Sequence, residues 1–219
     1  MNPMNLESQE SRLISTTILP TTDAGVISQA TMILKSGGII SFPTDTVYGV
    51  AARFDDPVGI KRLFEVKGRD FNKAIAVLIG EKAQLSLVTA FFSDMGKKLA
   101  EVFWPGALTL VVIKNPTLPD VLSSQATVGV RMPNHPFTLA LLQTTGPLAT
   151  TSANLSGHEN PLTAQDVFTQ LGGKIELILD GGSTPGSIPS TVVDCTGHHP
   201  VILRDGAISA NAIQKALED

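Results

Sequence analysis

Short apolar runs limit most strongly what this chain can fold into, and several of them end at glycine or proline. The run "ALTLVVI" (107–113) is a clear example, and it stops at Lys114. No run reaches the roughly 18 consecutive apolar residues of a transmembrane helix, so we expect no membrane span. Short runs rich in β-branched residues predict buried strands instead. The predicted strands are 38–42, 46–53, 74–80, 107–113, 127–132, 147–151, 175–180, 190–195 and 200–204.

Helix start and stop signals stand between many of these runs. Asp56 and Pro57 supply a cap and a first-turn proline for a helix that ends at Gly68. Thr163 and Asp166 form a capping-box pattern at the start of another. The predicted helices are 23–35 (capped by Asp23), 56–68, 81–88, 93–103 (capped by Ser93), 136–146, 163–171 and 210–218.

Strands and helices are mixed without strict alternation, which predicts an α/β (α+β) fold around a mixed, twisted sheet. The consecutive strands within 175–204 have no helix between them and are expected to pair antiparallel. A length of 219 residues and 42% hydrophobic content suit a single domain with a sizeable core. We place this domain at 18–219, behind a flexible N-terminal leader at 1–17.

Composition excludes several classes of protein. The net charge of −4 argues against a binder that depends on a basic surface throughout. Cys195 is the single cysteine, so no intramolecular disulfide can form. The first 17 residues lack the apolar core of a signal peptide. The four histidines show no zinc spacing, and we predict no metal ligand among the side chains. We expect a cytoplasmic protein with no membrane association.

The stretch "KGRDFNK" (67–73) concentrates cations in a chain of which only 16% is charged. Lys67, Arg69 and Lys73 fall on one loop between a predicted helix and a predicted strand. Arginine binds phosphate and carboxylate through two parallel hydrogen bonds, and lysine acts as a compact charge. The cluster therefore indicates a site for a polyphosphate, although a solvated loop would have the same composition.

Two polar loops without cations follow predicted strands. Thr44, Asp45 and Thr46 interrupt one strand and suit either recognition of a polar ligand or a local turn. The loop "TTSANLSG" (150–157) offers hydroxyls, an amide and backbone N–H groups, which suit a phosphate or adenine, or a turn with a helix cap. The glycine-rich stretch 180–194 lacks the Gly-Lys-Ser/Thr of a P-loop and is expected to connect strands.

Arg131 and Arg204 each end an apolar strand, where a cation needs a partner. That partner is either a carboxylate of this protein or a bound anion. Because no serine-hydrolase, zinc-protease or dinucleotide motif is present, the sequence favours chemistry by positioning and electrostatics over covalent catalysis.

Taken together, these stretches resemble the YrdC family of threonylcarbamoyl-AMP synthases, from about residue 19 to 206. The family signature, K-x-R followed later by S-x-N, corresponds here to 67–69 and 152–154. The matching segments are "SFPTDTVYGVAA" (41–52), "KGRDFNKAIAVLI" (67–79), "FWPGALTLVV" (103–112), "VGVRMPNHP" (128–136), "TSANLSG" (151–157), "STVVD" (190–194) and "ILRDG" (202–206).

The resemblance implies a single YrdC-like domain whose helices and sheet surround a concave, positively charged cavity. It implies that L-threonine, bicarbonate and ATP, the last with Mg²⁺, are joined into threonylcarbamoyl-AMP with release of pyrophosphate. A threonylcarbamoyl-transfer enzyme complex would then use this product to modify adenosine 37 of ANN-decoding tRNAs. It also implies that the chain is the short family form, without the linker and extra C-terminal domain of the long form.

The resemblance assigns roles to residues by their place in the motifs. The catalytic signature is Lys67, Arg69, Ser152 and Asn154. The residues expected to bind ATP are Arg69, Lys73, Thr127, Ser152, Asn160 and Arg204. The residues expected to bind L-threonine are Thr46, Arg131, Thr150 and Ser190.

Four positions depart from the usual family pattern: Asp70, Ala74, Ala107 and Thr151. Asp70 places a negative charge beside the expected anion site, which is expected to weaken ATP binding. Two other functions remain open at this point. One is an RNA-binding module of the same fold that binds tRNA or double-stranded RNA without catalysis. The other is a paralogue that adenylates a different carbamoyl compound.

Overall fold

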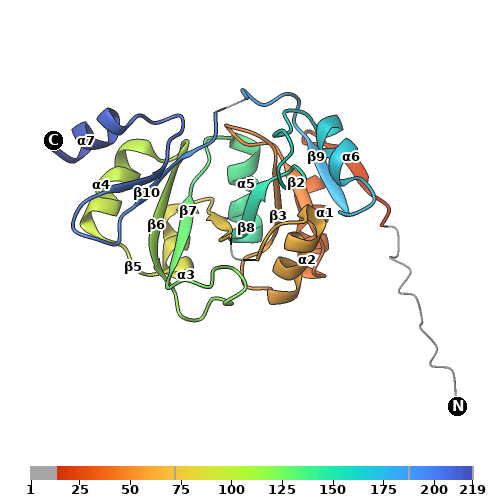
Figure 1. Ribbon diagram of the computed structural model, residues 1–219. Helices are drawn as coiled ribbons and strands as arrows, with labels where there is room; N and C mark the ends of the chain where they lie inside the picture. The colour runs from red at the N-terminus through yellow and green to blue at the C-terminus, as the bar shows by residue number, and fades with distance from the viewer. Residues whose placement is uncertain (1–13, 72, 187, 219) are drawn as a thin grey trace, which may run out of the picture.

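The computed structural model describes residues 14–71, 73–186 and 188–218, and these form one mixed sheet surrounded by helices (Figure 1). The sheet has 11 strands in the order β1-β9-β2-β3-β8-β4-β7-β6-β10-β11, with β5 paired to β6 outside this path. The predicted α/β class and mixed sheet are therefore confirmed. Of the predicted leader at 1–17, residues 1–13 lie outside the described residues.

The strands are β1 (Thr17–Pro20), β2 (Ile40–Phe42), β3 (Gly49–Arg53), β4 (Ala76–Leu78), β5 (Thr89–Phe91), β6 (Leu108–Lys114), β7 (Thr127–Arg131), β8 (Leu148–Ser152), β9 (Leu177–Asp180), β10 (Thr191–Asp194) and β11 (Val201–Arg204). The helices are α1 (Val26–Lys35), α2 (Pro57–Lys67), α3 (Leu85–Val88), α4 (Asp94–Phe103), α5 (Pro136–Thr145), α6 (Ala164–Leu171) and α7 (Ala210–Glu218), with a 3-10 turn at Lys82–Gln84 before α3.

Local capping chemistry fixes several helix ends where the sequence predicted them. The Asp56 carboxylate accepts a hydrogen bond from the Val58 N–H at 3.0 Å, and α2 ends at Gly68 with φ of 57°. The capping box of α6 forms as expected. The prediction that Asp23 caps α1 is wrong, because Gly25 occupies that position and makes no side-chain cap.

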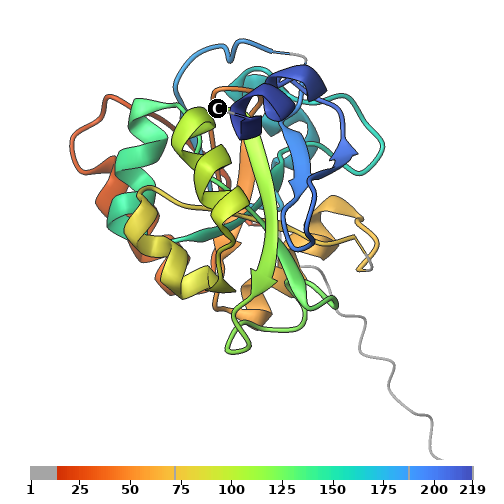
Figure 2. The ribbon, with the colours of Figure 1, turned by 90° about the vertical axis from the view of Figure 1, so that its left-hand side faces the viewer.

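Consecutive residues of the central strands point to opposite faces, and each face buries them against different helices. Val50 of β3 and Val77 of β4 pack in the larger core with side chains of α2 and α4. Their neighbours Ala51 and Leu78 pack in the second core with α1 and α5. Figure 1 shows α4 and α7 beside β6 and β10, at the end of the sheet away from α6 and β9, and Figure 2 faces this end.

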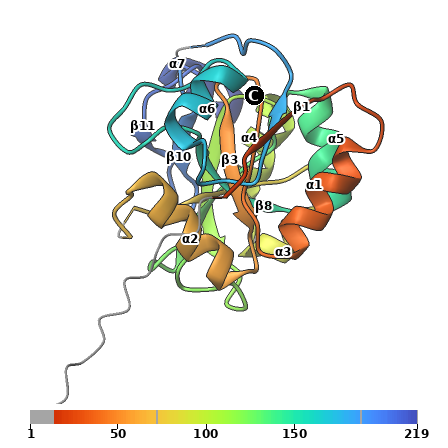
Figure 3. The same cartoon turned by 90° about the vertical axis from the view of Figure 1, so that its right-hand side faces the viewer.

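The pairing of the last strands differs in part from the prediction. β10 and β11 are antiparallel as expected, but β9 lies at the other end of the sheet, parallel to both β1 and β2. β10 instead joins β6 in parallel. Residue 17, the predicted end of the leader, already lies in β1, which pairs with β9 (Figure 3). Within the described residues, the sheet therefore begins at residue 17. No helix in the described ranges has the length and hydropathy needed to cross a membrane.

Candidate active site

One cavity of about 520 Å³ gathers polar side chains from segments far apart in the sequence. Arg69 comes from the α2–β4 loop, Ser152 from the end of β8, Arg131 from the end of β7 and Arg204 from the end of β11. This volume falls in the range of roughly 300–1,000 Å³ that small-molecule sites occupy. These groups are far apart in the sequence. They meet because the order of the strands in the sheet places the ends of β7, β8 and β11 and the α2–β4 loop around one cavity.

The cavity exists because five neighbouring strands carry small residues at the same level of the sheet. A Cβ added to Gly49 of β3 would lie 3.0 Å from the Thr150 methyl carbon of β8. A Cβ on Gly129 of β7 would lie 3.1 Å from the Thr109 methyl carbon of β6 and 3.6 Å from the Ala76 Cβ of β4. All five residues line the cavity, so they form a floor across β3, β8, β4, β7 and β6.

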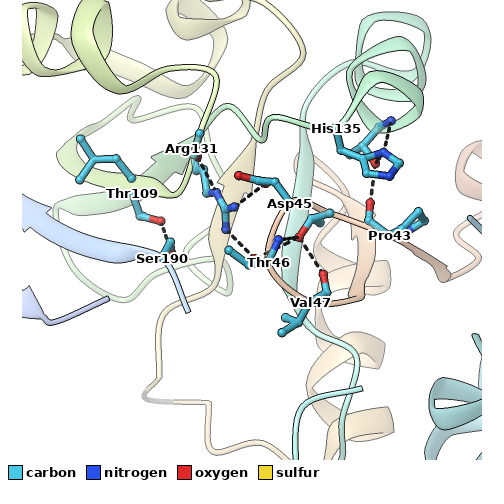
Figure 4. A network of polar contacts seen from close by, with 12 residues as sticks. Pro43, Asp45, Thr46, Val47, Thr109, Arg131, His135 and Ser190 are labelled. Atoms are coloured by element: carbon cyan, nitrogen blue, oxygen red, sulfur yellow. Dashed lines mark hydrogen bonds and ion pairs between the residues drawn. The ribbon is translucent and has the colours of Figure 1, made fainter. Parts of the chain in front are cut away.

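Thr44, Thr46 and Val47 line one part of the cavity, and Figure 4 shows the polar contacts of the turn that carries them. The Thr44 hydroxyl donates to the Val47 carbonyl at 2.7 Å, accepts from the Thr46 N–H and lies 3.0 Å from the Thr46 hydroxyl. Thr138, in the first turn of α5, donates to the Pro43 carbonyl. The sequence suggested either a local turn or recognition of a polar ligand for residues 44–46. The bonds form the local turn, and the same turn places Thr44 and Thr46 at the cavity. Strand β3 begins only at Gly49, three residues later than predicted.

Arg131 is held from three sides. Its Nη2 donates to the Asp45 carboxylate at 2.6 Å, its Nη1 to the Thr46 hydroxyl at 3.2 Å and its Nε to the Gly106 carbonyl at 3.0 Å (Figure 4). The partner of this strand-end arginine is thus a carboxylate of the protein itself. Burial lowers the pKa of Arg131, Asp45 opposes that shift, and the charge of Arg204 lowers the pKa further. Because a guanidinium has five N–H donors, two remain beyond these three bonds.

Arg69 and Arg204 are anchored to neutral oxygens. Arg69 donates to the carbonyls of Lys73 and Ala74, and Arg204 donates to the carbonyl and hydroxyl of Ser190. Burial lowers the pKa of both arginines, and for Arg69 the nearby charge of Arg204 lowers it further. The two cations therefore act on the same region of the cavity, and an anion placed between them would relieve their repulsion.

Lys67 lies behind the cavity and organises the loop after β8. Its ammonium group donates to the carbonyls of Ser152 and Asn154 and to the Asn154 side-chain oxygen at 3.3 Å. The Ser152 hydroxyl also donates to that side-chain oxygen. Burial, followed by the charge of Arg69, lowers the pKa of Lys67 to about 7. The three acceptors around the ammonium group oppose this shift, because they favour the charged form of Lys67. Through these bonds Lys67 and Asn154 hold Ser152 in position.

Most of the predicted site residues meet in this cavity, and four do not line it. Thr46, Arg69, Arg131, Thr150, Ser152, Asn160, Ser190 and Arg204 line it. Lys67 and Asn154 lie behind it. Lys73 is exposed, and its backbone carbonyl accepts a hydrogen bond from Arg69. Thr127 is the first residue of β7, at the opposite end of the strand from Arg131. Sequence reasoning missed Asp45 as the partner of Arg131, and it missed Thr109, whose hydroxyl lies 2.9 Å from that of Ser190.

The described lining offers cations and hydroxyls but no carboxylate, imidazole, thiol or amine. Tyr48 also lines the cavity, but burial raises its pKa to about 12, so its phenol is a poor base near neutral pH. No group of three or more His, Cys, Asp or Glu that suits a metal ion occurs among the described residues. The arrangement can bind anions and stabilise charge that develops on them.

Comparison with known proteins gives consistent results. The family model Sua5_yciO_yrdC, described as telomere recombination, matches residues 32–206. A threonylcarbamoyl-AMP synthase of Bacillus subtilis is 40% identical over 87% of this chain, and a putative threonylcarbamoyl-AMP synthase of Mycobacterium tuberculosis is 38% identical over 88% of it. The structure of Pyrococcus abyssi Sua5 complexed with L-threonine superposes with a TM-score of 0.86 at 37% identity over 93% of this chain.

The matches differ in how much of the relative they cover. This chain spans 89% of the Mycobacterium protein, 56% of the Bacillus protein and 60% of the Pyrococcus structure.

Proposed function

Because the chain belongs to the Sua5/YciO/YrdC family, we propose that it is a threonylcarbamoyl-AMP synthase, joining L-threonine, bicarbonate and ATP with release of pyrophosphate. The observation that carries this proposal is the convergence of Arg69, Arg131 and Arg204 on one cavity with a floor of small residues. All three substrates are anions or carry a carboxylate, and the arginines are the charged side chains among the described lining residues.

The Arg131 end of the cavity suits the amino acid. The two remaining N–H groups of Arg131 can hold a carboxylate, and Thr46, Thr150 and Ser190 line the same cavity. Thr109 and Arg204 both hydrogen-bond Ser190 and fix its position. The Pyrococcus relative that superposes on this chain was solved as a complex with L-threonine, which supports this assignment.

The other end suits the nucleotide. Arg69 and Arg204 line the cavity and the charge of Arg204 acts on Arg69, while Ser152 and Asn160 add neutral polar groups to the same lining. Lys73 and Thr127 do not line the cavity, so we leave them out of this site. Asp70 raises the pKa of Arg69, so its charge reaches the phosphate region from the solvent side, in line with the weaker ATP binding expected from the sequence.

The described residues do not fit a resident Mg²⁺ site, because the lining lacks carboxylates and Asp45 is engaged by Arg131. Mg²⁺ would arrive with ATP as part of that substrate.

Positioning accounts for the reaction without an enzyme nucleophile. The amine of bound L-threonine attacks the carbon of bicarbonate, and water leaves as the carbamate forms. A carbamate oxygen then attacks the α-phosphorus of ATP, the bond from that phosphorus to the bridging oxygen breaks, and pyrophosphate leaves. Arg69 and Arg204 stabilise the charge on the phosphates, and a single cavity brings both reactants together. The product would pass to a threonylcarbamoyl-transfer complex that modifies adenosine 37 of tRNA in the cytoplasm.

A product assay tests the proposal directly. The protein is incubated with ATP, Mg²⁺, L-threonine and ¹³C-bicarbonate, and threonylcarbamoyl-AMP is sought by mass spectrometry. We expect a labelled product that requires all three substrates. ATP-independent binding of tRNA or double-stranded RNA without any adenylate would favour the RNA-binding module, and an adenylate formed only with another carbamoyl compound would favour the paralogue.

Filling the floor of the cavity should impair the same reaction. Gly129→Ala adds a methyl group 3.1 Å from the Thr109 side chain, and Gly129→Val adds two more carbons that reach into the cavity. Because misplacing a reactant by about 1 Å can cost about 10²-fold, we expect kcat/KM to fall about tenfold in the alanine variant and further in the valine variant. Steady-state pyrophosphate release measures this, with circular dichroism to verify folding. Equal activity in all three proteins would show that substrates do not lie on this floor.

A further inference from the structure

We propose that Asp45 determines which anions the Arg131 end of the cavity accepts, favouring a zwitterionic amino acid over phosphate. This inference rests on the proposed function and assigns a specificity-determining role to a residue that does not itself line the cavity. It acts through Arg131, to which its carboxylate is bonded.

The Asp45–Arg131 pair is close and buried. The two side chains are 2.6 Å apart and are 14% and 8% exposed, so water screens their interaction little. Thr46 and Gly106 hold the rest of the guanidinium, which leaves it one orientation toward the cavity. The pair is formally neutral, and its outward N–H groups can still hydrogen-bond a carboxylate.

The cavity is therefore asymmetric in charge. At the nucleotide end, the hydrogen bonds of Arg69 and Arg204 go to carbonyl and hydroxyl oxygens, which carry no formal charge. Asp70 influences Arg69, but it is exposed and does not line the cavity. Arg204 also bonds Ser190 and acts on Arg131, so it lies between the two ends. Arg69 and Arg204 thus keep positive charges for a polyanion, whereas Arg131 is neutralised by its own carboxylate partner.

This asymmetry would keep phosphate groups from competing with the L-threonine carboxylate for Arg131. ATP and the pyrophosphate product carry several negative charges, and phosphate oxygens fit an arginine as well as a carboxylate does. An unpaired Arg131 would attract them into the amino acid position. L-threonine has no net charge near neutral pH, so a neutral pair costs it little while the pair's carboxylate repels phosphate.

Binding competition in the full chain tests the inference without relying on turnover. Labelled L-threonine and labelled ATP are each measured by equilibrium dialysis while inorganic phosphate is added. For the unmodified protein we expect phosphate to displace ATP and to leave L-threonine bound. Asp45→Asn removes the charge with little change of shape, and phosphate should then displace L-threonine at about tenfold lower concentration or less. Asp45→Glu retains the charge and should retain the exclusion of phosphate.

The control is Asp55→Asn, which removes the carboxylate of a surface pair with Arg53 outside the cavity and should behave like the unmodified protein. If phosphate displaces L-threonine and ATP from the unmodified protein equally well, the inference is overturned even if Asp45→Asn does not fold. If folded Asp45→Asn excludes phosphate as before, Asp45 has a structural role only. If the unmodified protein binds no L-threonine at all, the proposed function itself fails.

Discussion

Replacing Arg69 with alanine is expected to abolish pyrophosphate release in the presence of L-threonine and bicarbonate, while the fold stays intact. Arg69 lines the cavity, and its own hydrogen bonds go to the Lys73 and Ala74 carbonyls of an exposed loop rather than to the core. Removing one preorganised donor to developing charge typically costs about 10²–10³-fold in rate. We expect kcat/KM to fall by at least about 10²-fold in a coupled pyrophosphate assay.

Two further variants show whether the guanidinium itself matters. Arg69→Lys keeps the charge but loses the two-pronged geometry, so it should recover only part of the activity. Arg53→Ala removes an arginine that pairs with Asp55 at 2.7 Å outside the cavity, and it should be fully active. Activity of Arg69→Ala equal to that of Arg53→Ala would contradict the role given to Arg69.

Replacing Lys67 with methionine should reduce both stability and activity. Methionine fits the buried space but cannot donate, so the carbonyls of Ser152 and Asn154 lose their shared donor, while the Asn154 side-chain oxygen keeps the bond from the Ser152 hydroxyl. Each orphaned buried acceptor costs about 1–3 kcal/mol, and relief of the desolvation that lowers the pKa of Lys67 offsets part of the loss. We expect the free energy of unfolding in urea to fall by about 2–4 kcal/mol. Because the Ser152 loop shifts, kcat/KM of the folded fraction should also fall by about 10²-fold.

Lys114 provides a matched control. It is also buried, and its ammonium group donates to the Asp120 carboxylate at 3.0 Å and to the Ser123 carbonyl at 2.9 Å, outside the cavity. Lys114→Met should therefore lose stability without losing activity per folded molecule. If Lys67→Met shows the same behaviour, Lys67 stabilises the fold but does not position Ser152.

The parts of the fold that the sequence predicts well are those decided by neighbouring residues. The caps at Asp56 and Thr163 and the stop at Gly68 depend on backbone groups within one turn, so a short window contains the whole interaction. Asp23 fails as a cap because the chain makes a further turn, and Gly25 with φ of 82° starts α1 instead. The preferences of single residues do not show which of two nearby positions becomes the first residue of the helix, because tertiary packing decides between them.

Pairings between distant strands could not be predicted in the same way. β9 was expected beside β10, yet it joins β1 and β2, whose residues lie more than 130 positions earlier in the chain. Parallel pairs of this kind leave no turn signature, because the connection runs through other elements. β5 was missed for a different reason: it is only three residues long, too short to show the alternation that marks a strand, although it pairs antiparallel with the nearby β6.

The site was predictable to the extent that motifs mark it. The resemblance gave the arginines, Ser152 and the hydroxyls that line the cavity, but it could not show that Lys73 faces solvent or that Thr127 lies at the far end of β7. Asp45 was visible only as part of a polar loop, and its pairing with Arg131 joins residues 86 positions apart.

A crystal structure with L-threonine and a non-hydrolysable ATP analogue tests the central claim most directly. The account predicts that the L-threonine carboxylate lies on Arg131 and the phosphates lie between Arg69 and Arg204, in the same cavity. Either ligand bound at a separate surface, or phosphates seated on Arg131 beside an intact Asp45, would contradict it.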